Sequence, residues 1–218
     1  MRLLERFLDS SAVSLKICGV TTRDDAHRLV EMGVDALGVN FWPRSKRCLP
    51  AGNAGWLGDL AGRILRVGVF VNESPALPLR LVRDGLLDAV QLHGDETPEE
   101  AVVYQKEGIP FFKAIGVKTL DDLERAPDFH ASAILLDAHA PGVYGGTGGT
   151  FDWGSAIDFK THHPFLPVIL AGGITAENAG LAAATVRPAA LDVATGAEIS
   201  PGIKDFDKVA ALLAALNR

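Results

Sequence analysis

Short, uninterrupted apolar runs recur along the chain and are separated by more polar segments. Such runs, without strict alternation, are typical of parallel strands that are covered on both faces. They predict eight strands, at L-K-I-C-G (15–19), D-A-L-G-V-N-F (35–41), I-L-R-V-G-V-F-V (64–71), D-A-V-Q-L-H-G (88–94), P-F-F-K-A-I (110–115), A-S-A-I-L-L-D (131–137), L-P-V-I-L-A-G-G (166–173) and A-A-L-D-V-A-T-G (189–196).

The polar segments between these runs carry helix signals. The clearest is T-P-E-E-A-V-V-Y-Q-K-E-G, where Thr97 caps the start, Pro98 takes the first helical position and Gly108 ends the helix. The same reasoning predicts helices over 22–32, 53–61, 79–84, 120–125, 176–184 and 204–216, with a short one after F-D-W at 151–153. Several glycines weaken the helix at 53–61.

Strands that alternate with helices at this spacing predict a parallel sheet. Eight units within 218 residues fit a single α/β domain, a (β/α)8 TIM barrel over 14–218. Residues 1–13 form an N-terminal extension, which could pack as a short amphipathic segment under the first strand. The structural alternative is a doubly wound open sheet, which would bind a ligand at one switch point rather than at every strand end.

Composition and charge narrow the class of protein. The net charge of −6 argues against a nucleic-acid partner, since proteins that bind nucleic acids carry broad basic surfaces. No run approaches the roughly 20 apolar residues of a membrane helix, and acidic residues interrupt the start of the chain where a signal peptide is apolar. Two cysteines give no disulfide framework. We therefore expect a cytoplasmic protein with two free thiols and no membrane partner.

Reactive and polar side chains gather at the predicted carboxyl ends of the strands, where barrels place their active sites. They are Cys18 after the first strand, Arg47 after the second, Gln91 and His93 on one face of the fourth, Asp137 at the sixth and Asp192 in the eighth. Each also has a structural interpretation. A strand cysteine is often a small buried hydrophobe, a strand-end aspartate often caps the next helix, and loop cations are often only solvated.

Glycine-rich loops follow the seventh and eighth strands, in A-G-G-I-T-A-E-N and A-T-G-A-E-I-S-P-G. The barrel phosphate site recurs at these two loops, because glycine lets backbone N–H groups approach a phosphate. The candidates are Gly172, Gly173, Thr195 and Gly196, and ordinary left-handed turns are the alternative. The loop P-G-V-Y-G-G-T-G-G-T at 141–150 could close over a substrate. The remaining histidines show no metal-ligand spacing.

Several motifs, in order, resemble the phosphoribosylanthranilate isomerase family of tryptophan biosynthesis. They include K-I-C-G-V-T-T-R-D-D-A, D-A-L-G-V-N-F-W-P-R-S-K-R, D-A-V-Q-L-H-G-D-E, I-L-L-D, L-A-G-G-I-T-A-E-N and S-P-G-I-K-D, and the resemblance runs from about Ser14 to near the end of the chain. It implies a (β/α)8 barrel without metal or organic cofactor. The implied reaction is an Amadori rearrangement of a small-molecule substrate, N-(5-phosphoribosyl)anthranilate, to 1-(2-carboxyphenylamino)-1-deoxyribulose 5-phosphate.

The resemblance also implies residue roles. Cys18 matches the general base, Asp137 the general acid and Arg47 the arginine that meets the anthranilate carboxylate. Gln91, His93 and Asp192 match positions that line the substrate site, and the four loop residues Gly172, Gly173, Thr195 and Gly196 match the phosphate loops.

The chain departs from the family pattern at Asn40, where an apolar residue is common, at Cys48, where an aromatic is common, and at A-T-G, which leaves only Thr195 where two serines are common. Other phosphate-binding barrels fit less well. Indole-glycerol-phosphate synthase needs catalytic lysine and glutamate at strand ends, and the histidine-pathway sugar isomerase has an aspartate where Cys18 stands. Two alternatives stay open. The chain could be a non-catalytic sensor of a phosphate ligand, and it could be a monomer or a homodimer.

Overall fold

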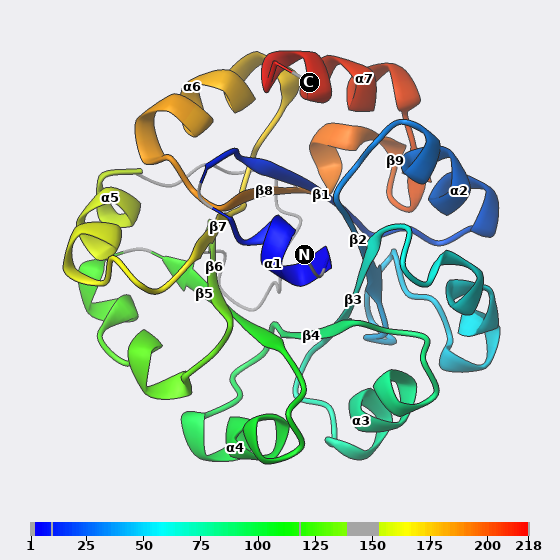
Figure 1. Ribbon diagram of the computed structural model, residues 1–218, viewed down its shortest axis with the longest axis horizontal. Coiled ribbons are helices and arrows are strands. Elements are labelled where there is room, and N and C mark those ends of the chain that lie inside the picture. The colour runs from blue at the N-terminus through cyan, green and yellow to red at the C-terminus, as the bar shows by residue number, and fades with distance from the viewer. Residues whose placement is uncertain (1–2, 10, 118, 139–152, 218) are drawn as a thin grey trace.

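The computed structural model describes residues 3–9, 11–117, 119–138 and 153–217, the range to which all structural statements refer. Eight parallel strands close into a barrel in chain order, with helices outside (Figure 1). The strands are β1 (Ser14–Cys18), β2 (Ala36–Asn40), β3 (Leu65–Phe70), β4 (Ala89–Leu92), β5 (Phe111–Val117), β6 (Ala133–Ala138), β7 (Val168–Leu170) and β8 (Ala190–Val193). The barrel prediction is confirmed, and the closed ring excludes the open sheet.

The outer ring consists mainly of α-helices. They are α2 (Arg23–Glu31), α3 (Ala76–Arg83), α4 (Pro98–Lys106), α5 (Trp153–His162), α6 (Ala176–Val186) and α7 (Phe206–Ala215). The predicted start of α4 is confirmed. The Thr97 side chain accepts a hydrogen bond from the Glu100 backbone N–H, and the Glu100 carboxylate accepts one from the Thr97 N–H. This capping box satisfies two donors that the first helical turn leaves unpaired.

Two of the predicted helices are 3-10 helices rather than α-helices. The segment at 53–61 is a 3-10 helix, η1 (Ala51–Leu60), and the segment at 120–125 is replaced by two short ones, η2 (Leu120–Leu123) and η3 (Ala126–Phe129). Glycine in η1 and Pro127 in η3 disfavour a longer α-helix, because glycine has high backbone entropy and proline lacks an N–H.

The last helix begins two residues later than predicted. Asp205 caps α7 by accepting hydrogen bonds from the backbone N–H groups of Asp207 and Lys208. Lys204 therefore stands outside the helix, in β10 (Ile203–Lys204), which pairs antiparallel with β9 (Glu198–Ser200). This hairpin was not among the predicted elements, and it follows the short 3-10 helix η4 (Thr195–Ala197).

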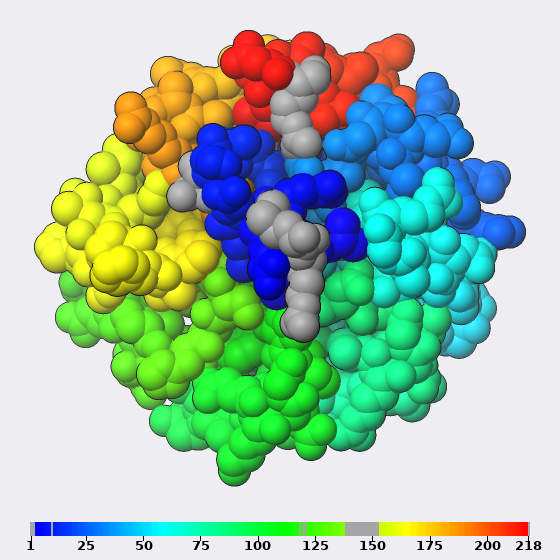
Figure 2. Space-filling view, in the orientation of Figure 1, coloured from blue at the N-terminus to red at the C-terminus, as the bar shows by residue number. Residues whose placement is uncertain are grey.

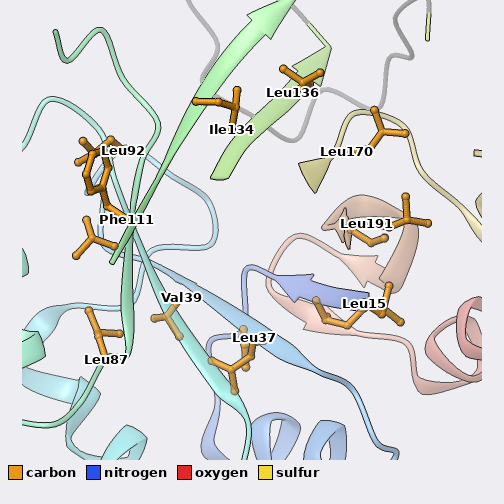
Figure 3. Packing of buried hydrophobic residues seen from close by; sticks show 14 of the residues in the cluster. Leu15, Leu37, Val39, Leu87, Leu92, Phe111, Ile134, Leu136, Leu170 and Leu191 are labelled. Carbon is orange, nitrogen blue, oxygen red and sulfur yellow. The ribbon is translucent and has the colours of Figure 1, made fainter. Parts of the chain in front are cut away.

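Alternate residues along each strand belong to two separate apolar cores. Side chains such as Leu15, Leu37 and Leu191 point outward and pack under the helices (Figure 3). The inward side chains form a second cluster that is rich in alanine and includes Ala36, Ala89 and Phe112. Period-2 alternation along a strand therefore sends Leu15 and Ile17 to the helices and leaves Ser14, Lys16 and Cys18 for the interior.

The N-terminal extension closes one end of the barrel. Helix α1 (Leu3–Phe7) lies across the middle of the ring in Figure 1, and Figure 2 shows the N-terminal segment over the centre of this face. Phe7 is 1% exposed and its ring stacks on Phe112 of β5, with 6.0 Å between centroids. The predicted packing of the extension against the barrel thus takes the form of a plug. Among the described residues, no helix is long and apolar enough to cross a membrane.

Candidate active site

A cavity of about 930 Å³ opens at the carboxyl ends of the strands. It is lined by residues of β1, β2, β3, β6 and β8, by His93 just after β4, and by the loops after β2, β7 and β8. Of the predicted site residues, Cys18, Arg47, His93, Asp137, Gly172, Gly173, Asp192, Thr195 and Gly196 line it. Gln91 is not among the lining residues, because it is fully buried beneath His93. The predicted lid at 141–150 lies outside the described residues.

Cys18 ends β1 and stands beside Gly38 of β2. A Cβ atom at Gly38 would lie 2.7 Å from the Cys18 sulfur and 3.1 Å from Lys16 Nζ, so the absence of a side chain there makes room for both. Burial raises the pKa of the Cys18 thiol above its ordinary value, and Asp192 adds to the rise. The positive charges of Lys16 and Lys204 oppose it. The thiol is therefore mostly protonated near neutral pH.

Lys16 is the buried charge beneath this cysteine. Its side chain is 0% exposed, and Nζ donates to Asp192 Oδ1 at 2.9 Å and to Gln91 Oε1 at 3.0 Å. Burial by itself lowers the pKa of Lys16, but the ion pair with Asp192 and the nearby Cys18 hold it above its ordinary value. Lys16 therefore stays a cation inside the barrel.

His93 and Asp137 form the opposite side of the cavity. Gln91 Nε2 lies 2.7 Å from His93 Nδ1, and His93 Nε2 lies 3.4 Å from Asp137 Oδ2. The Asp137 side chain is 11% exposed and the His93 side chain 15%, so both reach the cavity but are largely shielded from solvent. A carboxyl group in such a setting can hold or release a proton toward a bound molecule.

Arg47 reaches the cavity from the loop after β2 and pairs with Glu198 of β9. Its Nε lies 2.9 Å and 3.0 Å from the two Glu198 oxygens, and its Nη2 lies 2.6 Å from Oε2. Gly19 has φ +76°, and a Cβ there would lie 2.4 Å from Arg47 Cδ, so glycine lets the arginine cross the end of β1. The hydrogen bonds that Arg47 donates to Glu198 raise the pKa of Arg47.

Sequence reasoning missed Glu198 and Lys204, which support this arginine. Lys204 Nζ donates to Glu198 Oε1 at 2.7 Å and to the Cys18 backbone carbonyl, and the Gly202 N–H donates to the same carboxylate. Burial alone would raise the pKa of Glu198, but Arg47 and Lys204 hold it below its ordinary value. Both residues lie inside the quoted motifs A-T-G-A-E-I-S-P-G and S-P-G-I-K-D, but no local signal indicates the pairing, because Arg47 and Glu198 are 151 positions apart.

The two glycine loops form one wall of the cavity. Gly172 and Gly173 have φ angles of 81° and 64°, which only glycine adopts without strain. A Cβ at Gly196 would lie 2.1 Å from the Ile174 carbonyl oxygen, so the two loops touch closely. The Thr195 hydroxyl accepts a hydrogen bond from Arg47 Nη2 at 3.2 Å.

Two of the three departures from the family pattern, Asn40 and Cys48, differ in their position relative to the cavity. Asn40 lines the cavity, and its Oδ1 accepts a hydrogen bond from the Trp42 backbone N–H at 2.8 Å. Cys48 is a free thiol that is absent from the cavity lining. Across the described part of the chain, no group of three or more His, Cys, Asp or Glu side chains is placed to hold a metal ion.

The closed barrel and this cavity define a class of protein, a (β/α)8-barrel enzyme with its reactive side chains at the carboxyl ends of the strands. A model of the family described as N-(5'phosphoribosyl)anthranilate (PRA) isomerase matches residues 15–215. The N-(5'-phosphoribosyl)anthranilate isomerase of Pseudomonas syringae pv. tomato is 43% identical over 210 residues, which cover 95% of this chain and 98% of the relative. The chain belongs to this isomerase family.

Solved structures agree with the family assignment. The phosphoribosyl anthranilate isomerase of Thermotoga maritima superposes with a TM-score of 0.84 at 39% identity, covering 94% of this chain and 98% of that one. A further isomerase structure, in complex with reduced 1-(o-carboxyphenylamino)-1-deoxyribulose 5-phosphate, has a TM-score of 0.80 at 37% identity, with 94% and 98% covered. Another Thermotoga structure is described as monomers generated from a dimeric isomerase.

Proposed function

We propose that this protein converts N-(5-phosphoribosyl)anthranilate to 1-(2-carboxyphenylamino)-1-deoxyribulose 5-phosphate in tryptophan biosynthesis, with Cys18 as general base and Asp137 as general acid. One observation carries the proposal. In a chain that matches the isomerase family along nearly its whole length, a thiol, a carboxyl and a guanidinium line the same cavity. The substrate is a small anionic molecule, and the expected setting is the cytoplasm, where both cysteines stay free thiols.

The acid step opens the sugar ring. Asp137 donates its proton to the ring oxygen as the bond from that oxygen to C1′ breaks, which leaves a hydroxyl group and a positively charged Schiff base. Asp137 is supported in this role because its side chain lines the cavity and is largely shielded from solvent.

The base step uses the acidity that the Schiff base creates. Its positive nitrogen weakens the C2′–H bond, and the Cys18 thiolate takes that proton to give an enolamine. The enolamine becomes the ketone when its hydroxyl proton is lost and C1′ gains one. Over a turnover Asp137 loses one proton and Cys18 gains one, so solvent exchange must restore both. Each positioned proton transfer contributes roughly 10²–10⁴-fold to the rate.

Arg47 would recognise the anthranilate carboxylate. Glu198 occupies the guanidinium edge formed by Nε and Nη2, and Nη2 also donates to Thr195, so Nη1 is the nitrogen that would meet a second carboxylate. A planar guanidinium can serve two carboxylates in this way, whereas a lysine ammonium has no second edge. The loops that hold Gly172, Gly173, Thr195 and Gly196 would take the phosphate through backbone N–H groups.

A non-catalytic sensor of the same ligand is the competing function. It would bind a product analogue but would not turn over substrate, so a sensor has no need for an acid and a base on opposite sides of the cavity. The test follows anthranilate fluorescence after purified protein meets freshly prepared substrate, with Cys18→Ala and Asp137→Asn alongside. The proposal expects turnover by the wild type and losses of at least roughly 10²-fold in each folded variant. A wild type that binds without converting would support the sensor.

A further inference from the structure

A continuous chain of polar side chains crosses the barrel interior from one side of the cavity to the other. It runs from Asp192 to Lys16 (2.9 Å), from Lys16 to Gln91 (3.0 Å), from Gln91 to His93 (2.7 Å) and from His93 to Asp137 (3.4 Å). These five residues come from four strands or their ends, and Lys16 and Gln91 are both 0% exposed. Solvent therefore cannot supply alternative partners to the middle of the chain.

The chemistry of the groups fixes the direction of each hydrogen bond. A lysine ammonium has donors only, so Gln91 must present its carbonyl oxygen to Lys16. The Gln91 amide nitrogen then faces His93 Nδ1 and donates to it. A proton on Nδ1 would set two donors against each other at 2.7 Å, and the buried amide cannot turn because Lys16 holds its oxygen.

The same logic places the single proton of the neutral imidazole. With Nδ1 acting as acceptor, the proton lies on Nε2, the nitrogen that faces Asp137 Oδ2. The 3.4 Å separation is long for a hydrogen bond, and such contacts often shorten when a substrate closes the site.

We propose that Lys16 is a positioning residue for the acid: acting through Gln91, it fixes the Nε2–H tautomer of His93 and so keeps a hydrogen-bond donor on Asp137. The donor orients the Asp137 carboxyl group and stabilises the carboxylate that forms once Asp137 has delivered its proton. This role rests on the proposed function of Asp137 as general acid, whereas the tautomer itself does not depend on that function.

The first test is nitrogen NMR of the wild-type protein with 15N-labelled histidine at neutral pH. The chain has six histidines, and the signals of His93 are assigned as those absent from His93→Gln. We expect His93 to show an unprotonated Nδ1 and a protonated Nε2. A protonated Nδ1 in the wild type would overturn the proposal. Because this readout needs no turnover, it stands whether or not the catalytic roles are correct.

The second test replaces the amide with a group that cannot donate. In Gln91→Glu the carboxylate can accept from Lys16 but offers no N–H to His93, so the proton should move to Nδ1. We expect the NMR signature to switch and kcat to fall roughly tenfold or more, as for other residues that orient a reacting group. Thermal unfolding of the variant checks that it is folded.

A double variant shows whether the effect passes through the histidine. In a His93→Leu background, Gln91→Glu should cause little further loss of kcat, because the imidazole through which Gln91 acts is already gone. An equal further loss would mean that Gln91 acts by another route and would overturn the proposal. One further outcome separates this proposal from the proposed function. If Asp137→Asn keeps full activity while His93 shows the expected tautomer, Asp137 is not the general acid, but the assigned hydrogen-bond directions around Gln91 are still correct.

Discussion

The two ends of the barrel interior hold different kinds of side chain. At the carboxyl end, Lys16, Gln91 and Asp192 are buried together with their charges and amide paired. At the other end, Phe7 of the α1 plug stacks on Phe112 within an apolar cluster rich in alanine. Buried ion pairs contribute little net stability, whereas buried aromatic rings contribute through the hydrophobic effect. We infer that one end of the interior is built for chemistry and the other for stability.

The largest expected effect comes from removing the buried cation. Lys16→Met leaves the Asp192 carboxylate without its partner in the interior, which should lower the free energy of unfolding by about 3–5 kcal/mol. Urea unfolding measures the change. The matched control is Lys16→Met with Asp192→Asn, which removes both charges and should recover a large part of the stability. No recovery would show that the loss comes from packing rather than from the unpaired charge.

A substitution at the opposite end of the barrel should lower stability without changing the rate of catalysis. Phe7→Ala removes the ring that seats α1 on Phe112, and should lower the free energy of unfolding by about 2 kcal/mol. Its kcat/KM should stay within about twofold of the wild type, since Phe7 lies at the other end of the barrel from the cavity. A large fall in kcat with unchanged stability would contradict the division between the two ends.

Arg47→Lys tests the two edges of the guanidinium. Lysine keeps a positive charge beside Glu198 but lacks a second planar edge for the substrate carboxylate. We expect KM to rise by about tenfold, equivalent to roughly 1.4 kcal/mol, with a smaller change in kcat. Steady-state kinetics separates the two constants. A change in kcat alone would place Arg47 in the chemical step instead of in binding.

Gly38→Ala should have the smallest effect on stability and a local effect on the thiol. The added methyl group would lie 2.7 Å from the Cys18 sulfur, so the sulfur or Lys16 must shift. We expect a destabilisation of about 1 kcal/mol, together with slower turnover and altered alkylation of Cys18. Gly52→Ala is the control, because no atom lies within 4 Å of a Cβ at that position. Equal effects of both variants would show that crowding at Cys18 is unimportant.

The sequence was informative where the signal is local. Continuous apolar runs and capping motifs such as Thr97 with Glu100 depend on neighbouring residues, so the barrel and the start of α4 could be predicted. The resemblance to the isomerase family is likewise confirmed. The difference in helix type has the same origin. The residue propensities over 53–61 favour a helix but do not distinguish a 3-10 helix from an α-helix.

The site was predictable in position but not in its internal pairing. Strand ends meet at one face of any parallel barrel, so Cys18, His93 and Asp137 could be placed around one cavity before any contact was known. The pairing of Arg47 with Glu198, and of Lys16 with Gln91, joins residues 151 and 75 positions apart. Such pairs depend on the register of the closed barrel, which the sequence pattern does not specify. The roles of the individual site residues stay predictions.

The most direct test of the acid–base account follows the loss of kcat/KM while iodoacetamide alkylates Cys18 at several pH values. Burial raises the pKa of this thiol, so the thiolate fraction, and with it the alkylation rate, should increase about tenfold per pH unit below that pKa. The account predicts that activity is lost at the rate at which Cys18 is alkylated, and that both rates rise with one shared pKa, above the ordinary thiol value. Activity that survives complete alkylation of Cys18 would contradict Cys18 as the base.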